Sequence, residues 1–324
     1  MTAPPPGLDV LCFGEVLIDF FPEPAGRSLV EAQRFVPCLG GAPANVAVAL
    51  GRLGLRAGLL TLVGRDGFGA LCRRRLVEAG VDVSALGIHP RHKTGITFVS
   101  AAPDGGRAFL FFRNPSADQC VADSDVDPAR VAAARALHFG SSTLCREPAA
   151  AATRKALDAA AAAGATVSFD PNLRPHLWER PEEAAAEVRA LLPRCHLLKV
   201  ADDELAPLCG TDDPVEGARA LRALGARLVV VTAGARGCWF DGPMGRGAVP
   251  ARPAVAVDAT GAGDAFVAGL LWRLVPLLGA GRTVADLALG EVRAACEAGA
   301  EYGARAVTAV GATTWIAPTA TSEG

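Results

Sequence analysis

The five residues Thr260-Gly-Ala-Gly-Asp264 place two glycines and a carboxylate at the start of an apolar helix. We read residues 255–257 as a short buried strand before this loop and residues 265–272 as an apolar helix face after it. The first N–H groups of a helix lack partners, and the helix dipole favours negative charge there. The glycines let the backbone approach a phosphate, and Asp264 could accept a proton from a hydroxyl. The loop therefore predicts a meeting point for a phosphate and an alcohol.

A simpler structural explanation accounts for the same five residues. An aspartate in the first turn of a helix is commonly a cap or a partner of the helix dipole. Glycines at that position often only relieve a tight turn. On this loop alone both explanations stay open, because short motifs match by chance.

A second glycine-rich turn, Val231-Thr-Ala-Gly-Ala-Arg-Gly237, follows the most apolar strand run. Its Thr232 could offer a hydroxyl to a phosphate, and Gly234 and Gly237 would let the backbone approach. A tight turn without a ligand explains the pattern as well.

Two glycines, Gly40 and Gly41, open a predicted helix that carries Asn45 in its first turns. Asparagine is a poor residue for a helix interior, so its side chain either caps locally or turns toward a ligand. Asp19 ends the first predicted strand run, where a carboxylate at the carboxyl end of a strand could accept hydrogen bonds from sugar hydroxyls.

The remaining chemical side chains have equally ordinary explanations. Arg113 and Arg174 each leave a predicted strand, and each alone is explained by a surface ion pair. The histidines show no metal-ligand spacing. We therefore expect His138 and His196 to be packed in strand ends and the others to be solvated.

Longer nucleotide motifs are missing from the sequence. None of the three lysines follows a glycine, which excludes a Gly-Lys-Ser/Thr phosphate loop. Neither Gly-x-Gly-x-x-Gly nor His-Arg-Asp occurs, so dinucleotide dehydrogenases and protein kinases are disfavoured.

The elements that must position these residues alternate between β-rich runs and Ala- and Leu-rich helical stretches. The strand runs are residues 10–13, 57–63, 136–139, 166–169, 196–200 and 227–232, and the helical stretches are 42–53, 68–79, 148–163, 181–192 and 214–224. This alternation predicts an α/β fold in which helices cover both faces of a mostly parallel sheet.

Two segments, about 20–39 and 94–115, break this alternation. The second holds two apolar runs around the turn Pro103-Asp-Gly-Gly106, which indicates a β-hairpin. With no helix to cover it, the hairpin should project as a small lid sheet. Ligands in open α/β sheets bind at the carboxyl ends of the strands, where such a lid would close.

Composition points to an enzyme acting on small molecules. The 324 residues are 51% hydrophobic, enough for a large core. With 32 basic and 34 acidic residues, no net field attracts nucleic acid or an anionic membrane. Nine cysteines without a Cys-x-x-Cys pair, and no signal peptide or membrane span, lead us to expect a cytoplasmic protein.

Over essentially its whole length the chain resembles the ribokinase-like (PfkB) carbohydrate kinases. The N-terminal signature of that family corresponds to residues 40–54 and the C-terminal one to residues 258–266, in the right order and spacing. Residues 111–118 and 169–178 look most like those of fructokinases. The resemblance implies a single ribokinase-like kinase domain over residues 7–316, with the two lid segments inserted in it.

The resemblance also implies a role for each candidate residue. Asp264 would take the proton of the sugar hydroxyl as that hydroxyl attacks the γ-phosphate of ATP, and N–H groups of the loop would stabilise the transferred charge. The loop residues are Gly261, Ala262 and Gly263. The sugar would be held by Asp19, Gly40, Gly41, Asn45, Arg113 and Arg174. The nucleotide would lie along Lys199, Glu204, Thr232, Gly234, Gly237 and Gly303.

The cofactors that the resemblance implies are ATP and Mg²⁺. Glu204 would order Mg²⁺ through water, because this ion keeps much of its hydration. Ala201 and Ala300 stand where many members carry Asn, which leaves a direct metal contact and the adenine contacts open. A K⁺ site beside the Asp258 loop is implied by the resemblance alone.

The predicted activity is phosphorylation of fructose to fructose 6-phosphate. A 2-keto-3-deoxygluconate kinase is the alternative, which depends on whether Arg113 and Arg174 meet a hydroxyl or an acid. A nucleoside kinase fits the lid hairpin less well. A catalytically silent regulatory protein is the alternative of another class, although such a protein should lose Asp264 first. The open edges of a lid sheet also suggest a homodimer through the lid.

Overall fold

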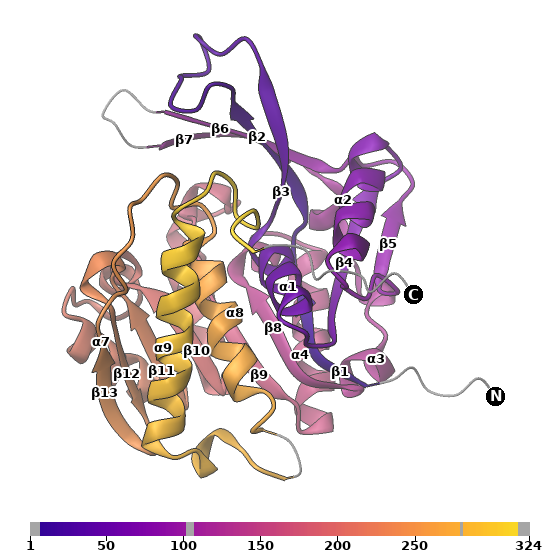
Figure 1. Cartoon of the computed structure of the whole chain (residues 1–324). Coiled ribbons are helices and arrows are strands. Elements are labelled where there is room, and N and C mark those ends of the chain that lie inside the picture. The colour runs from indigo at the N-terminus through magenta and orange to yellow at the C-terminus, as the bar shows by residue number, and fades with distance from the viewer. Residues whose placement is uncertain (1–6, 102–106, 279–280, 317–324) are drawn as a thin grey trace, which may run out of the picture.

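The computed structural model describes residues 7–101, 107–278 and 281–316. Within these residues nine strands form the central sheet (Figure 1). In spatial order they are β13 (Gly245–Val249), β12 (Cys238–Gly242), β11 (Leu228–Thr232), β10 (Leu197–Ala201), β9 (Thr166–Asp170), β8 (Ala134–Gly140), β1 (Leu8–Phe13), β4 (Ala57–Gly64) and β5 (Leu86–His89). All neighbouring pairs are parallel except those that β12 makes with β11 and β13, so the predicted mostly parallel sheet is confirmed.

Helices cover both faces of this sheet because successive side chains of each strand point to opposite faces. In β1, Val10 and Cys12 belong to one core cluster, whereas Leu11 and Phe13 belong to the other. The first cluster is completed by helices α1 (Ala42–Arg52), α2 (Gly67–Glu78), α8 (Ala262–Leu274) and α9 (Leu289–Ala306). The second involves α4 (Ala149–Ala163), α5 (Ala184–Leu191), α6 (Leu205–Cys209), α7 (Pro214–Ala223) and the short α3 (Pro128–Ala132).

Local signals fix where several helices begin and end. Asp213 caps α7 by accepting hydrogen bonds from the N–H groups of Val215 and Glu216, and Pro214 occupies the first turn. Helix α4 ends at Gly164, whose φ of 68° lies in the left-handed region. These positions were within a few residues of the boundaries that the sequence predicts.

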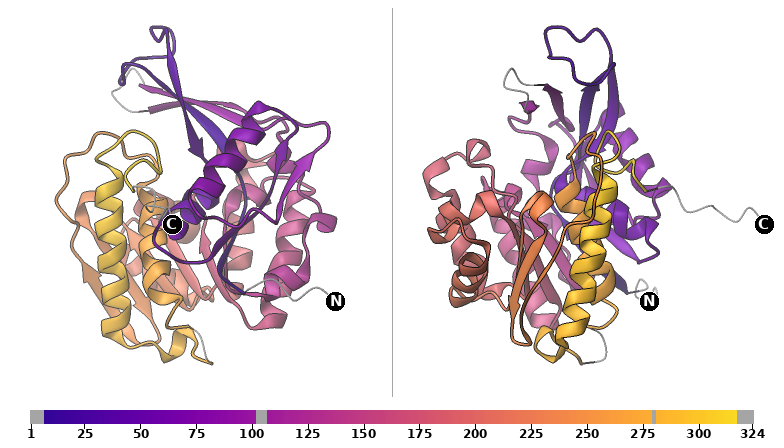
Figure 2. Two further views of the ribbon diagram at one scale, coloured as in Figure 1. Left: turned by 45° about the vertical axis from the view of Figure 1, so that its right-hand side comes forward. Right: turned by 60° about the vertical axis from the view of Figure 1, so that its left-hand side comes forward.

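The predicted lid is a separate sheet of four strands, which projects from the main body (Figures 1 and 2). Its spatial order is β3 (Phe35–Gly40), β2 (Leu17–Pro22), β6 (Gly95–Ala101) and β7 (Arg107–Phe112). The sheet begins at Leu17, slightly before the expected boundary at residue 20. Strands β6 and β7 pair antiparallel as the hairpin prediction requires, while the turn at 103–106 lies outside the described residues.

The position of Asp19 corrects a prediction. Asp19 does not end a strand of the central sheet, because β1 already ends at Phe13. It lies in the middle of β2, paired with Cys38 of β3 and Thr97 of β6. Its carboxylate is therefore carried by the lid rather than by the main body.

The prediction of a buried strand at residues 255–257 is wrong. This segment belongs to no strand, and the exposed fractions of Val255 and Val257 are 83% and 62%. It follows the edge strand β13, so no neighbouring strand can cover it. Ala254 and Ala256 instead line the cavity described below, and the N–H of Val257 donates to the carbonyl of Val307.

Candidate active site

The glycine loop before α8 is shaped by close packing and forms one wall of a cavity. Gly261 has a φ of 75°, and a Cβ atom there would lie 2.4 Å from Cβ of Ala312. Only glycine fits both restrictions. Gly261, Ala262 and Gly263 all line the cavity, so the N-terminal end of α8, with its positive dipole end, faces it.

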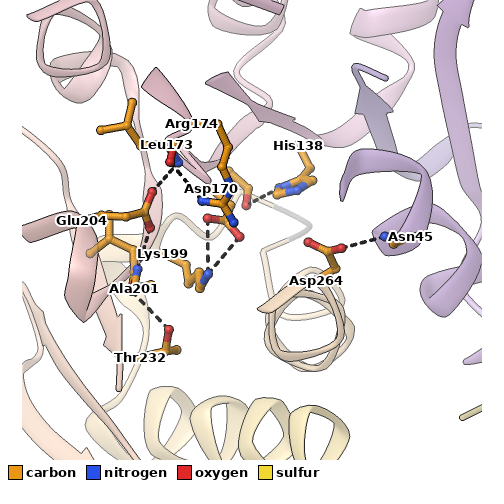
Figure 3. A network of polar contacts seen from close by, with 12 residues as sticks. Asn45, His138, Asp170, Leu173, Arg174, Lys199, Ala201, Glu204, Thr232 and Asp264 are labelled. Atoms are coloured by element: carbon orange, nitrogen blue, oxygen red, sulfur yellow. Dashed lines mark hydrogen bonds and ion pairs between the residues drawn. The ribbon is translucent and has the colours of Figure 1, made fainter. Parts of the chain in front are cut away.

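Asp264 lies in the first turn of α8 and is buried. Burial raises its pKa to about 7, and the carboxylates of Asp170 and Glu15 act in the same direction. Asn45 of α1 opposes this rise, since its Nδ2 donates to Oδ2 of Asp264 at 2.7 Å (Figure 3). The pKa of this carboxyl group is therefore close to neutral pH, which suits a general base.

Asp19 faces the same cavity from the lid. Burial raises its pKa to about 7, opposed by the Thr97 hydroxyl and the charge of Arg113. Gly40 does not line the cavity, contrary to the prediction that it holds the sugar. A Cβ atom at Gly40 would lie 2.2 Å from Oδ2 of Asp19, so this glycine leaves room for the carboxylate.

Gly41 does line the cavity, at the start of α1. Its φ is 100°, and a Cβ atom there would lie 2.4 Å from the carbonyl oxygen of Glu15. The Glu15 carboxylate accepts hydrogen bonds from the N–H of Ala42, at 3.0 Å, and from the hydroxyl of Ser142. Glu15 thus fixes the beginning of α1 and with it the position of Asn45.

Two arginines line the cavity, and they differ in burial and in their partners. Arg113 is buried, and its guanidinium forms an ion pair with the buried carboxylate of Asp118. Asp118 also accepts a hydrogen bond of 2.5 Å from the Ser116 hydroxyl. Arg174 is exposed, and its Nη1 donates to the carbonyl of Leu173 at 2.9 Å.

Lys199, in the middle of β10, and Glu204, in the turn after β10, form another wall of the cavity (Figure 3). The ammonium group of Lys199 donates to both carboxylate oxygens of Asp170, at 3.1 and 3.3 Å. The Glu204 carboxylate accepts from the N–H groups of Leu173, at 2.6 Å, and of Ala201, at 2.7 Å. Glu204 therefore joins the two loops that follow β9 and β10.

The turn after β11 and the middle of α9 complete the cavity. Thr232 donates its hydroxyl to the carbonyl of Val200 at 3.3 Å, while Gly234 and Gly237 have positive φ angles of 52° and 92°. Gly303 of α9 lines the same side, next to Ala300. This side of the cavity is therefore lined mainly by small residues.

One cavity of about 910 Å³ thus collects every predicted site residue except Gly40. Four acidic residues that line it were not assigned a role from sequence: Glu15, Asp170, Asp202 and Asp203. Asp118, also without an assigned role, lies behind the lining as the ion-pair partner of Arg113. Acidic residues at or just after a strand end are common in this sequence. Their position becomes informative only once the structure shows which side chain each of them contacts.

The histidines occupy two kinds of place: His138 is packed in a strand, and two others lie beside a cysteine. His138 is buried in β8, as expected, with Nδ1 3.0 Å from the Ser168 hydroxyl. His89 and His92, however, lie with Cys120 in a group whose potential ligand atoms fall within 4.8 Å of one another. Nδ1 of His89 accepts backbone N–H groups, so a metal on its other nitrogen would require loss of the ring's only proton. This group is therefore poorly suited to a metal.

No helix among the described residues is both long enough and apolar enough to cross a membrane.

The chain is similar to carbohydrate kinases over most of its length. The model of the pfkB family carbohydrate kinases matches residues 8–320. Probable fructokinase-4 of Arabidopsis thaliana is 40% identical over 267 residues, covering 82% of each chain.

Solved structures match over nearly the full length. Fructokinase with bound ATP from Xylella fastidiosa superposes with a TM-score of 0.86 at 33% identity, covering 95% of both chains. A fructokinase double mutant from Vibrio cholerae O395, with fructose, ADP and potassium bound, gives 0.83 at 32% identity, covering 96% of both chains. The chain described here belongs to the pfkB family of carbohydrate kinases.

Proposed function

We propose that this carbohydrate kinase transfers the γ-phosphate of ATP to a hydroxyl of fructose, giving fructose 6-phosphate. The observation that carries the choice of sugar is the buried ion pair between Arg113 and Asp118. The charge of Arg113 is already neutralised, while Asp19 and Asp264 add carboxyl groups to the same cavity. The buried arginine of the cavity thus offers an acid no unpaired charge, and Arg174 is exposed to solvent, so the site favours a neutral polyol.

In the proposed reaction Asp264 accepts the proton of the attacking hydroxyl. The hydroxyl oxygen forms a bond to the γ-phosphorus, the bond from that phosphorus to the bridging oxygen breaks, and ADP leaves. N–H groups of Gly261 to Gly263 would stabilise the charge on the transferred phosphoryl group. Asp19 and Asn45 would orient the sugar, and closure of the lid sheet would exclude water that could otherwise hydrolyse ATP.

The proposed metal is Mg²⁺, held through water by Glu204. Each carboxylate oxygen of Glu204 takes one backbone N–H and retains a lone pair, and the residue lines the cavity. A hydrated ion suits such an outer contact, because Mg²⁺ dehydrates reluctantly. When bound with ATP, Mg²⁺ offsets the charge of the triphosphate. We keep K⁺ as an expected activator, since the similar Vibrio cholerae fructokinase binds potassium.

Release of ADP, measured with a coupled assay, tests the proposal. We expect kcat/KM for fructose to exceed that for 2-keto-3-deoxygluconate by on the order of 10², the effect of one unfavourable buried charge. Ribose, tagatose and adenosine serve as further acceptors. A preference for the acid sugar would overturn the assignment, and absence of turnover with every sugar would favour a silent regulatory protein.

The domain and location predictions remain part of the proposal. A single kinase domain over residues 7–316 is supported by the two core clusters, which share the central sheet. A reducing, cytoplasmic environment is supported by the nine cysteines, each of which is a free thiol.

A further inference from the structure

The ion pair between Asp170 and Lys199 is set by the register of two strands. In β9 and β10, Leu197 pairs with Ser168, and Leu198 pairs with Phe169. Asp170 and Lys199 are therefore neighbours on one face of the sheet, at its carboxyl edge. Both are at least nine-tenths buried, and the two hydrogen bonds hold the ammonium group in front of the carboxylate.

The ammonium group reaches from the sheet to the glycine loop. A Cβ atom on Gly263 would lie 3.0 Å from Nζ of Lys199, so the two groups are close neighbours across the cavity. A cation and a helix N-terminus at the same point combine their attraction for an anion. Any side chain at Gly263 would push Nζ away from this position.

A buried ammonium group needs such a partner. Removing it from water is unfavourable, and a lysine without a counter-charge turns to solvent or loses its proton. Burial works against the charged form of Lys199, but Asp170 foremost, then Glu204 and Asp264, hold its pKa above the ordinary value. His138 also faces this group and is neutral, because burial lowers its pKa to about 4.

We propose that Asp170 is a positioning residue, which holds the Lys199 ammonium group against the Gly261–Gly263 loop, ready to receive the transferred phosphoryl group. Asp170 does not act as the base, since its carboxylate is occupied by Lys199. Its contribution passes through the lysine, which contacts the phosphate. The inference rests on the phosphoryl transfer proposed above.

A double-mutant cycle tests this dependence. Lys199→Met should lower kcat by on the order of 10², as for loss of one charge-stabilising donor. Asp170→Asn should lower kcat by about 10- to 100-fold, with the KM for the sugar within about twofold of the parent value. The double variant should be no slower than Lys199→Met, because residues acting as a unit are not additive.

Two further measurements separate positioning from a merely structural role. In Asp170→Asn the alkaline limb of the kcat profile should move to lower pH, since Lys199 loses its main counter-charge. Ser168→Ala, on the same strand and face, should leave kcat and this limb unchanged. If Asp170→Asn alone folds poorly, the effect of this substitution is measured by comparing the double variant with Lys199→Met. Neither of these two proteins contains a buried, unpaired lysine.

The outcomes distinguish this inference from the proposed function. An additional tenfold loss in the double variant relative to Lys199→Met would overturn the positioning role, whatever the sugar. The same single and double variants can be compared by their affinity for ATP in the absence of sugar. This comparison tests the inference even if fructose is not the acceptor. There, Asp170→Asn and Lys199→Met should each weaken ATP binding, and the double variant should bind no more weakly than Lys199→Met. Additive losses would again overturn the inference.

Discussion

The carboxyl group of Asp264 combines burial, an amide donor and a neighbouring helix start. Asp264→Asn preserves its shape but cannot accept a proton, so we expect kcat to fall by at least about 10³ while the fold and ATP affinity stay near the parent values. Steady-state kinetics and calorimetric titration with ATP measure the two effects. Asp158→Asn, a surface substitution with an Arg194 partner, is the control. Undiminished turnover of Asp264→Asn would exclude the proposed base.

The raised pKa of Asp264, about 7, predicts an acid limb in the pH profile. A base must be ionised, so kcat/KM should fall as pH drops below about 7, and Asp19, with a pKa of about 7, should steepen the fall. Asn45 stabilises the ionised form, so Asn45→Ala should move the limb to higher pH. A profile flat between pH 5.5 and 8 would contradict both assignments.

The pairing of Arg113 with Asp118 predicts a change in substrate preference. Asp118→Asn removes the charge that neutralises Arg113, so the ratio of kcat/KM for 2-keto-3-deoxygluconate to that for fructose should rise by about tenfold or more. The ratio is measured on the folded fraction, verified by circular dichroism. Asp158→Asn, whose pair with Arg194 lies outside the cavity lining, should leave the ratio unchanged. An unchanged ratio in Asp118→Asn would remove the argument for a neutral sugar.

At the scale of elements, the start of α8 depends on a backbone conformation that only glycine adopts easily. Gly261→Ala places a methyl group against Ala312 in the left-handed region, so we expect a loss of about 1–3 kcal/mol in the free energy of unfolding and a lower kcat. Gly290→Ala in α9 is the matched control, because its Cβ atom would meet no neighbour. That change should be neutral or stabilising by about 0.5–1 kcal/mol. Thermal unfolding of both variants compares them directly.

The lid is the element whose outer face carries exposed apolar side chains. Along β7, Phe109 and Phe111 stack and line the cavity, whereas Leu110 and Phe112 point to the other face. Leu110 and Phe112 are 47% and 55% exposed, and Phe112 contacts Phe98 edge to face. This face and the open edges of β3 and β7 are the part of the lid that a partner could cover.

At the scale of the whole molecule, the proposed homodimer joins two chains through their lids. We expect sedimentation at micromolar concentration to give twice the mass of the chain, and Leu110→Lys to give the monomer, because the new charge would have to be buried in the interface. Val215→Lys, at an exposed apolar position on α7, should remain dimeric. A monomeric parent protein would refute the lid dimer.

Features that depend on residues close together in the chain could be predicted without the structure. The strand and helix boundaries, the hairpin of the lid and the glycine loop before Asp264 all follow from periodicity, capping and backbone freedom, which act over a few residues. Asn45 and Thr232 were proposed from the same kind of local signal, since each lies beside a recognisable helix start or strand end, whereas Lys199 was named only through the family resemblance.

The pairing of charges and the covering of segments could be read only from the folded chain. Val255 and Val257 look like a buried strand, but their place beyond an edge strand leaves them exposed. Asp19 belongs to the lid, Arg113 is neutralised by Asp118, and Asp170 holds Lys199 across two strands. These contacts join residues that are far apart in the sequence. They depend on strand register and on packing, which cannot be read from a short stretch of the chain.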